Sequence, residues 1–356
     1  MEKDFNGLAP WGQLARCVQN PDHSVAYFLD KDNSNLKADG STIDWAEVEA
    51  LGQNVMVQVS KFYAIKKWIE EQQAFVFGVT DKPITTDFVN EDEWQIHPAF
   101  YRDRTKLCDD QSAVPELVDY RYYGAFHGWK DSKNRLRSLP NKVPLANITI
   151  DVARNYAKNM GVGWSQLDYY LVYATQMLYI SEYGHPDAQT QIGRGFVDGN
   201  SAAINTGGTL SNGNNTFGEA TGKKQMSYRG IEDWWGNVYD WVDGLFCDSS
   251  RNILIGNKGF NNAGQGYENV GNGGSSNVLS GNIRHIQPYD KAGFIIKSSG
   301  GSYDNDGLYD NGGLSAGGVC RFGGSWNLNS NAGAFQLQLY VAAWNSIANV
   351  GARLCS

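Results

Sequence analysis

The stretch YRGIEDWWGNVYDWVDG, residues 228–244, says more about the fold than any other part of the 356-residue chain. Gly236 permits a tight turn or a close approach of the backbone. Asn237 can hold loop backbone together through its side-chain amide. The tryptophans of the stretch, Trp234, Trp235 and Trp241, are expected in the core and not as platforms for a ligand. Nothing in these residues requires catalysis, and they indicate a scaffold.

Two further phrases follow in order toward the end of the chain. The first is GVCRFGGSW, residues 318–326, and the second is NVGARL, residues 349–354. Gly323 and Gly324, like Gly236, permit a tight turn or a close approach of the backbone. Trp326 is expected in the core. The two phrases border a segment that is too irregular for an amphipathic helix or a buried strand.

The three phrases together resemble the formylglycine-generating-enzyme branch of the C-type-lectin fold. The resemblance covers about residues 118–356, with two helices at the place where that family has its pair. The motif positions that match the family are Gly230, Asp233, Gly236, Asn237, Val238, Trp241, Arg321, Gly323, Gly324, Ser325, Trp326, Gly351 and Arg353. The resemblance implies that Gly236, Asn237, Trp241, Arg321, Gly323, Gly324, Trp326, Gly351 and Arg353 are scaffold.

Local patterns outside these phrases predict an α+β chain, with two helices on an irregular antiparallel sheet. Residues 54–63 alternate between apolar and polar side chains as a half-buried strand does, and residues 74–80 and 118–129 are further strand candidates. We therefore expect a β-rich N-terminal region over residues 1–117. A C-type-lectin-like domain over residues 118–356 would follow it and include the variable segment 320–356.

The two helices are predicted from their capping residues. Asn147 or Thr149 can cap the first helix, within residues 147–161, and Gly161 suits its end. The second helix, within residues 165–184, has Ser165 as a candidate N-cap with Asp168 three residues later, and Gly184 at its end.

Composition excludes several classes of function. The net charge of -8 gives no general attraction for nucleic acid or an anionic membrane. No run approaches the ~18 apolar residues of a membrane span, and the N-terminus has no visible secretion signal. The five cysteines are widely spaced, which favours free thiols over disulfides or a metal site, although Cys320 and Cys355 flank the final segment and could approach each other.

The related oxidases imply an alternative, a metal-dependent enzyme. Their cysteines bind copper between the Gly-Gly-Ser phrase and the terminal arginine, and thiolates are ligands that select copper(I). This chain has no cysteine between Ser325 and Leu354. Another branch uses a histidine-rich iron site, but the five histidines here, His23, His97, His127, His185 and His285, are scattered. A non-enzymatic protein is therefore predicted.

The final segment is similar to a second branch of the fold, the variable proteins of diversity-generating retroelements, which are phage receptor-binding or bacterial surface proteins. Their C-terminal codons are mutated at adenines, and asparagine codons are favoured targets. Most of the irregular residues here are asparagine or lie one or two adenine changes from it, and Trp344 can arise from an arginine or lysine codon. The residues between them, 332–339 and 342–343, resemble a fixed frame.

The resemblance implies a variable binding surface whose side chains are exposed, with Tyr340 and Trp344 as its main contacts. Large aromatic side chains ringed by asparagine and serine provide contact area and adaptable hydrogen bonds, as in antibody paratopes. The positions expected on this surface are Ser325, Asn327, Leu328, Asn329, Ser330, Asn331, Tyr340, Val341, Trp344, Asn345, Ser346, Ile347 and Asn349.

The same resemblance implies the partner and the setting. The partner would be a receptor on a bacterial surface, either protein or glycan, and the protein would be a homo-oligomer, a trimer if it sits on a phage tail. Phrases such as residues 10–18 and 96–100 are similar to tail-associated members, which favours a phage virion protein present in the cytoplasm before assembly.

A calcium-dependent sugar lectin is a second alternative. Residues 300–313 contain oxygen ligands suited to calcium, although their spacing is not that of an EF-hand. These ligands are Asp304, Asn305, Asp306, Asp310 and Asn311. No cofactor is expected apart from this calcium alternative, and the identity of any metal stays open.

Overall fold

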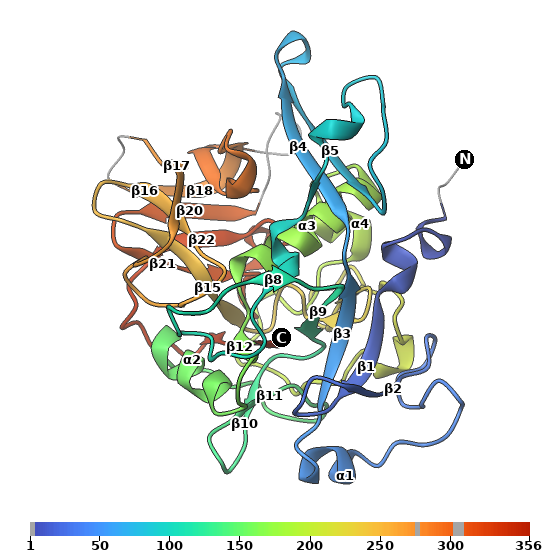
Figure 1. Cartoon of the computed structure of the whole chain (residues 1–356). Coiled ribbons are helices and arrows are strands. Elements are labelled where there is room, and N and C mark those ends of the chain that lie inside the picture. Colours follow the sequence, from blue (N-terminus) through green and yellow to red (C-terminus); the bar gives the residue numbers. More distant parts are fainter. Residues whose placement is uncertain (1–3, 275–277, 302–309) are drawn as a thin grey trace.

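The computed structural model describes residues 4–274, 278–301 and 310–356 (Figure 1). Its first sheet has six strands in the order β12-β24-β9-β3-β1-β2. The strands of this sheet are β1 (Ala15–Gln19), β2 (Val25–Phe28), β3 (Asn54–Ser60), β9 (Tyr120–Gly124), β12 (Ser165–Gln166) and β24 (Leu354–Cys355).

The end of the chain closes this sheet. Cys355 of β24 pairs with Tyr123 of β9 and with Ser165 of β12. The last strand therefore lies beside the first strand of the region that resembles a C-type lectin, so the terminal segment returns to the start of that region. Strand β3 also pairs with β9 over five residue pairs, so the sheet continues across the expected boundary between residues 117 and 118.

The second sheet has nine strands and carries the final segment. Eight of them have the order β17-β16-β15-β21-β22-β20-β18-β19, and β23 pairs with β15 in parallel. Together with the helices, the two sheets confirm the α+β class. The strands are β15 (Tyr239–Cys247), β16 (Asn252–Ile255), β17 (Glu268–Asn272), β18 (Val278–Ile286), β19 (Ile296–Ser299), β20 (Asn311–Ser315), β21 (Gly318–Phe322), β22 (Leu337–Val341) and β23 (Val350–Gly351).

A long hairpin projects beside these two sheets (Figure 1). It consists of β4 (Tyr63–Ile69) and β5 (Ala74–Thr80), and β6 (Gln95–Ile96) pairs with β4. The bounds of β5 are those that the sequence predicts. Three short pairs complete the strands: β7 (Tyr101–Arg102) with β8 (Glu116–Leu117), β10 (Trp129–Lys130) with β11 (Leu136–Arg137), and β13 (Ser227–Tyr228) with β14 (Ile231–Glu232).

The helices are α1 (Trp45–Ala50), α2 (Ile150–Lys158), α3 (Tyr169–Tyr183) and α4 (Ala188–Ile192). Both predicted helices are confirmed, but Ser165 is not the cap of α3. It belongs to β12, because its backbone pairs with the terminal strand. Asp168 caps α3 instead, and its carboxylate accepts a hydrogen bond from the Leu171 N–H at 3.1 Å. Gly184 ends the helix in the left-handed conformation, as predicted.

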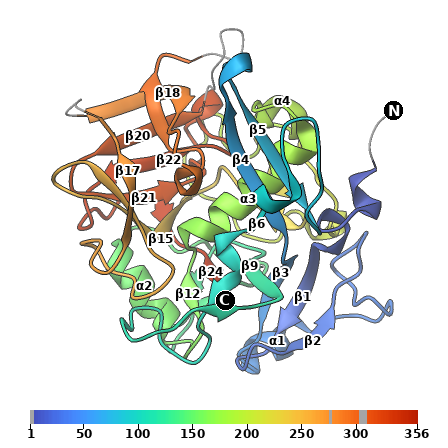
Figure 2. The same cartoon turned by 45° about the horizontal axis from the view of Figure 1, so that its top comes forward.

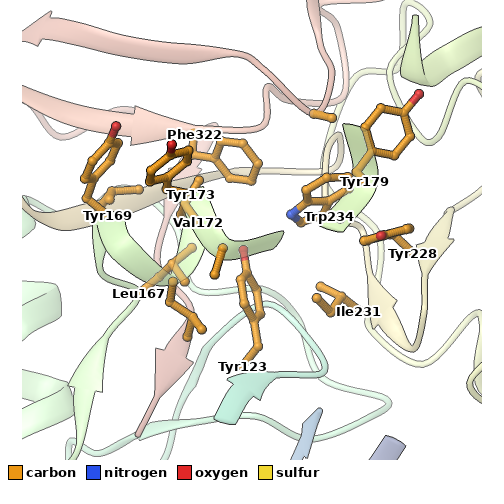
Figure 3. Close-up of a cluster of buried hydrophobic side chains, with 14 of the residues drawn as sticks. Tyr123, Leu167, Tyr169, Val172, Tyr173, Tyr179, Tyr228, Ile231, Trp234 and Phe322 are labelled. Atoms are coloured by element: carbon orange, nitrogen blue, oxygen red, sulfur yellow. The ribbon is translucent and has the colours of Figure 1, made fainter. Parts of the chain in front are cut away.

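Helix α3 is the centre of the core. It runs between the nine-stranded sheet and the β4–β5 hairpin (Figure 2), and all of its residues from Tyr169 to Tyr179 are buried. A helix that is buried around its whole circumference needs apolar neighbours on every side. Figure 3 shows these neighbours around Tyr179 and Trp234, whose ring centroids lie 5.8 Å apart.

Candidate functional site

The variable segment begins with a frame. Strand β22 lies inside the nine-stranded sheet, antiparallel to β21 and parallel to β20. A strand with neighbours on both edges and other elements on both faces has few exposed side chains. Val341 is accordingly only 3% exposed, and it packs in a core cluster with Trp241 and Val319. The prediction that Val341 is an exposed display position is wrong.

Tyr340, the neighbour of Val341 on β22, is half-buried. Its ring lies directly against Gly313 of β20, where a Cβ atom would overlap it. Because Gly313 has no side chain, the Tyr340 ring can pack directly on its backbone. Tyr340 nevertheless remains partly accessible to solvent. The predicted exposure of Tyr340 is confirmed in part.

The loop after β22 projects into solvent. Trp344 is 80% exposed and Ile347 is 40% exposed, as predicted for both. The backbone of this loop is nevertheless fixed, because the Asn147 N–H donates to the carbonyl oxygens of Ile347 at 3.2 Å and of Val350 at 3.1 Å. The Ser346 hydroxyl also donates to the Asn147 amide oxygen at 3.3 Å. An exposed ring on such a loop can change without disturbing its support.

Ser325 starts the other part of the segment and is fully buried, so its predicted exposure is wrong. Its hydroxyl accepts a hydrogen bond from the Asn349 amide at 2.9 Å and donates to Asn327 at 3.2 Å. It therefore joins residues 325–331 to the end of the Trp344 loop. The two irregular parts of the segment meet at this contact.

Residues 327–331 are otherwise accessible. Asn327, Asn329 and Ser330 are exposed, and Leu328 and Asn331 are half-buried. The backbone is held from outside the segment, since Asn329 donates to the Val197 carbonyl at 3.0 Å and accepts from the Gln189 amide at 2.9 Å. We call the accessible positions the display surface: Asn327, Leu328, Asn329, Ser330, Asn331, Tyr340, Trp344, Asn345, Ser346, Ile347 and Asn349.

Two asparagines outside the segment support the display surface and were missed from the sequence. Asn147 takes the left-handed conformation at φ 58°, which asparagine adopts more readily than most residues. Asn200 donates from its backbone N–H and its side-chain amide to the Trp326 carbonyl, at 3.1 and 3.0 Å. Their residue type was the one available signal, but asparagine is frequent in this chain.

The scaffold phrase at residues 228–244 folds as its residue types predict. The Asn237 side chain accepts from the Ile204 N–H and donates to the Ile204 carbonyl, both at 3.0 Å. Gly236, Gly323 and Gly324 all have φ close to +90°, and Gly236 lies against the Phe196 backbone. Trp241 is fully buried, and its indole N–H donates to the Ile148 carbonyl at 2.9 Å.

Trp326 differs from the other tryptophans of these phrases. Its ring is half-buried and not fully inside the core. Its backbone is well anchored, because the N–H donates to the Asn237 carbonyl at 3.0 Å. The prediction that this ring lies in the core is therefore confirmed only in part. The hydrogen bonds that anchor Trp326 are made by its backbone.

Arg353 holds the terminal phrase in the core. Its guanidinium donates to Asp240 at 2.8 Å, to the Gly124 carbonyl at 3.1 Å and to the Asp233 carbonyl at 2.9 Å. His127 contacts the same carboxylate at 3.0 Å. Burial opposes ionisation of Asp240, but the charge of Arg353 and the contact with His127 hold the pKa of that carboxyl below its ordinary value. Arg321 is not part of this network, and its guanidinium lies 4.1 Å from the centroid of the Tyr239 ring.

The described residues offer no constellation for metal chemistry. Within residues 4–274, 278–301 and 310–356, no three His, Cys, Asp or Glu side chains are grouped to hold a metal ion. Of the calcium alternative, Asp304, Asn305 and Asp306 lie outside the described residues. Asp310 is buried, and its carboxylate accepts from the Phe335 N–H at 2.7 Å.

All five cysteines are free, as predicted, and all five are buried. Burial raises the pKa of the Cys355 thiol to about 11 and raises that of Cys320 further. Both therefore remain protonated at neutral pH and are poor nucleophiles or metal ligands. In the part of the chain that the structure describes, no helix has the length and apolarity needed to cross a membrane.

Comparisons with known proteins give one kind of match. No protein-family model matches the sequence, and no curated protein is detectably similar. Among solved structures, the Major Tropism Determinant U1 variant is similar with a TM-score of 0.34 and 12% identity, over 83% of this chain and 72% of that one. The M1 variant gives the same score and identity over 83% and 71%, and the P3c variant gives 0.32 and 12% over 83% and 72%.

Proposed function

We propose that this protein is a non-enzymatic receptor-binding protein whose C-terminal display surface contacts the target. The observation that carries the proposal is the contrast around Trp344. An indole that is 80% exposed sits on a loop whose backbone is bonded to the frame at Asn147. Exposed indoles are costly in water and are enriched where proteins bind partners.

The surrounding side chains suit a protein or glycan target. Asn327, Asn329, Ser330 and Ser346 are exposed and offer both donors and acceptors. Their backbone is pre-organised, so little conformational entropy is lost on binding. The display surface would thus combine one large aromatic anchor with adaptable polar contacts, as paratopes do.

We propose further that the display surface is diversified by a retroelement that mutates adenines. Asparagine is abundant on this surface, and the buried positions of β22 are mostly leucine and glutamine. Under this proposal the protein belongs to a phage tail and binds a receptor on the host cell surface. Several copies facing one surface would gain avidity, for which we propose a homotrimer.

Binding to host cells tests the receptor proposal. Purified protein should bind cells of the correct host, and Trp344→Ser should weaken binding at least about 30-fold, the loss expected of an aromatic hot spot. Phe28→Ser, which removes an exposed aromatic side chain of β2 outside the display surface, is the matched control. If Trp344→Ser binds as tightly as the unmodified protein, the display surface is not the receptor site. Sequencing isolates for adenine-specific differences in codons 325–349 tests the diversification separately.

A further inference from the structure

A groove lies beside the projecting hairpin, and none of the residues that line it belongs to the display surface. The groove has a volume of about 920 Å³, within the range of about 300–1,000 Å³ that is typical of small-molecule sites. One wall is formed by β4 and β6, and the other by the segment between β16 and β17. The N-terminal part of α3 lies beneath them, with Tyr170 and Tyr173 among the lining residues.

Two partly exposed aromatic rings line the groove. Trp68 is 41% exposed and Tyr101 is 37% exposed, and both line it. The Trp68 ring is held in place, because its N–H donates to Glu70 at 2.7 Å and its edge packs on Phe75 with the centroids 5.0 Å apart. A ring fixed in this way offers an apolar face at a low entropic cost.

Several neutral polar groups remain available in the groove. The hydroxyl of Tyr170 and the amides of Gln95 and Asn257 line it and make no side-chain hydrogen bond to another described residue. Burial raises the pKa of Tyr170, so its hydroxyl stays an uncharged donor. His97 is also buried and neutral, since burial lowers its pKa to about 3.

Most of the charged groups of the groove are already bonded, although the Asp290 carboxylate is exposed and Lys258 donates to the Ala113 carbonyl at 2.8 Å. Lys67 pairs with Glu93 at 2.5 Å, and Lys291 pairs with Glu268 at 2.6 Å. Lys66 is buried and donates to three backbone carbonyls, those of Gln287, Tyr289 and Gly293. These contacts tie β4 to the segment around η7 (Asp290–Ala292), part of which also lines the groove.

Fixed rings, free neutral donors and acceptors, and charges that are mostly bonded already match a neutral, polyhydroxylated ligand. Sugar rings present C–H faces that pack on aromatic side chains and hydroxyls that bond to amides and phenols. An anionic ligand would have to compete with the existing ion pairs. We propose that this groove binds a neutral oligosaccharide, without calcium, as a fixed second site that does not depend on the display surface.

The test uses the whole protein and a panel of linear neutral oligosaccharides, the pentamers of glucose, mannose, galactose and N-acetylglucosamine, in the presence of EDTA. Calorimetry should detect binding of at least one pentamer. Trp68→Ala and Tyr101→Ala should each weaken it by about tenfold, and Tyr170→Phe by about threefold, because it removes one hydroxyl and no ring. Tyr120→Ala is the matched control, an exposed tyrosine that does not line the groove.

The outcomes separate this site from the display surface. Trp344→Ser should leave the affinity for the pentamer unchanged. The proposal is overturned if no neutral pentamer binds, or if a heparin or sialic-acid oligomer binds in preference. It is also overturned if the groove variants bind like the unmodified protein, and loss through Trp344→Ser alone would assign the sugar to the display surface.

Discussion

Strand β22 and the loop that follows it are neighbours in sequence and opposites in structure. Val341 is buried between sheet and helix, and Trp344, three residues later, is almost fully exposed. Both are the kind of residue that mutation of adenines produces, so codon chemistry does not separate them. The separation comes from hydrogen bonds, since β22 pairs on both edges, whereas the loop is held by its backbone and by the side chains of Ser346 and Asn349. A position on this surface can vary where its own side chain makes no supporting bond.

The largest effect should come from breaking the frame at Arg353. Arg353→Leu would leave the Asp240 carboxylate buried beside His127 without its main partner. Loss of one member of a buried ion pair costs roughly 3–5 kcal/mol of unfolding free energy. Urea unfolding at neutral pH measures this loss. Arg321→Leu is the control on the same sheet, and equal losses in the two variants would show that the Arg353 network is not special.

A smaller loss should follow from placing a display residue in the frame. Val341→Asn would bury an amide in an apolar cluster and remove apolar contacts, at a cost of roughly 3 kcal/mol. Val341→Ala, which adds no polar group, should cost less. Thermal unfolding of the two variants checks the order. If the Val341→Asn protein is as stable as the unmodified one, position 341 tolerates a polar side chain and belongs to the display surface after all.

The sequence predicts the frame far better than it predicts the boundary of the display surface. The capping residue Gly184 and the Asn237 bridge follow from local chemistry, and the structure confirms them. The predictions of Ser165 as a helix cap and of Val341 as an exposed residue are wrong for a common reason. Both residues belong to strands whose pairing with distant residues determines their environment. The groove beside the hairpin was not predicted because it is assembled from separate parts of the chain, from β4 to η7 (Asp290–Ala292).

A charge buried in the frame should make stability depend on pH. Asp233 is fully buried, and burial together with the nearby Glu232 raises the pKa of its carboxyl to about 6. The unfolded chain loses this proton near pH 4 and the folded protein near pH 6, so this group lowers stability as pH rises through that interval. Asp233→Asn keeps an oxygen for the amides of Gln225 and Asn237.

We therefore expect Asp233→Asn to gain up to about 3 kcal/mol of stability relative to the unmodified protein at pH 8, and to gain nothing at pH 4. Urea unfolding at the two pH values measures both differences. A gain that is the same at pH 4 and pH 8 would show that the carboxyl does not titrate in this interval.

The smallest effect on stability should come from the most exposed side chain. Trp344→Ser removes a ring that is 80% in solvent and leaves the bonds of Asn147 to the loop backbone intact. Such a substitution changes the unfolding free energy by no more than about 0.5 kcal/mol. Trp326→Ala removes a half-buried ring and should cost more, though less than the roughly 3–5 kcal/mol of a core tryptophan. Thermal unfolding of both variants places them on one scale with Val341→Asn. The expected order of loss is Val341, then Trp326, then Trp344. If Trp344→Ser is instead as destabilising as Trp326→Ala, then the indole supports the frame, and a position held by the backbone alone would not be free to vary.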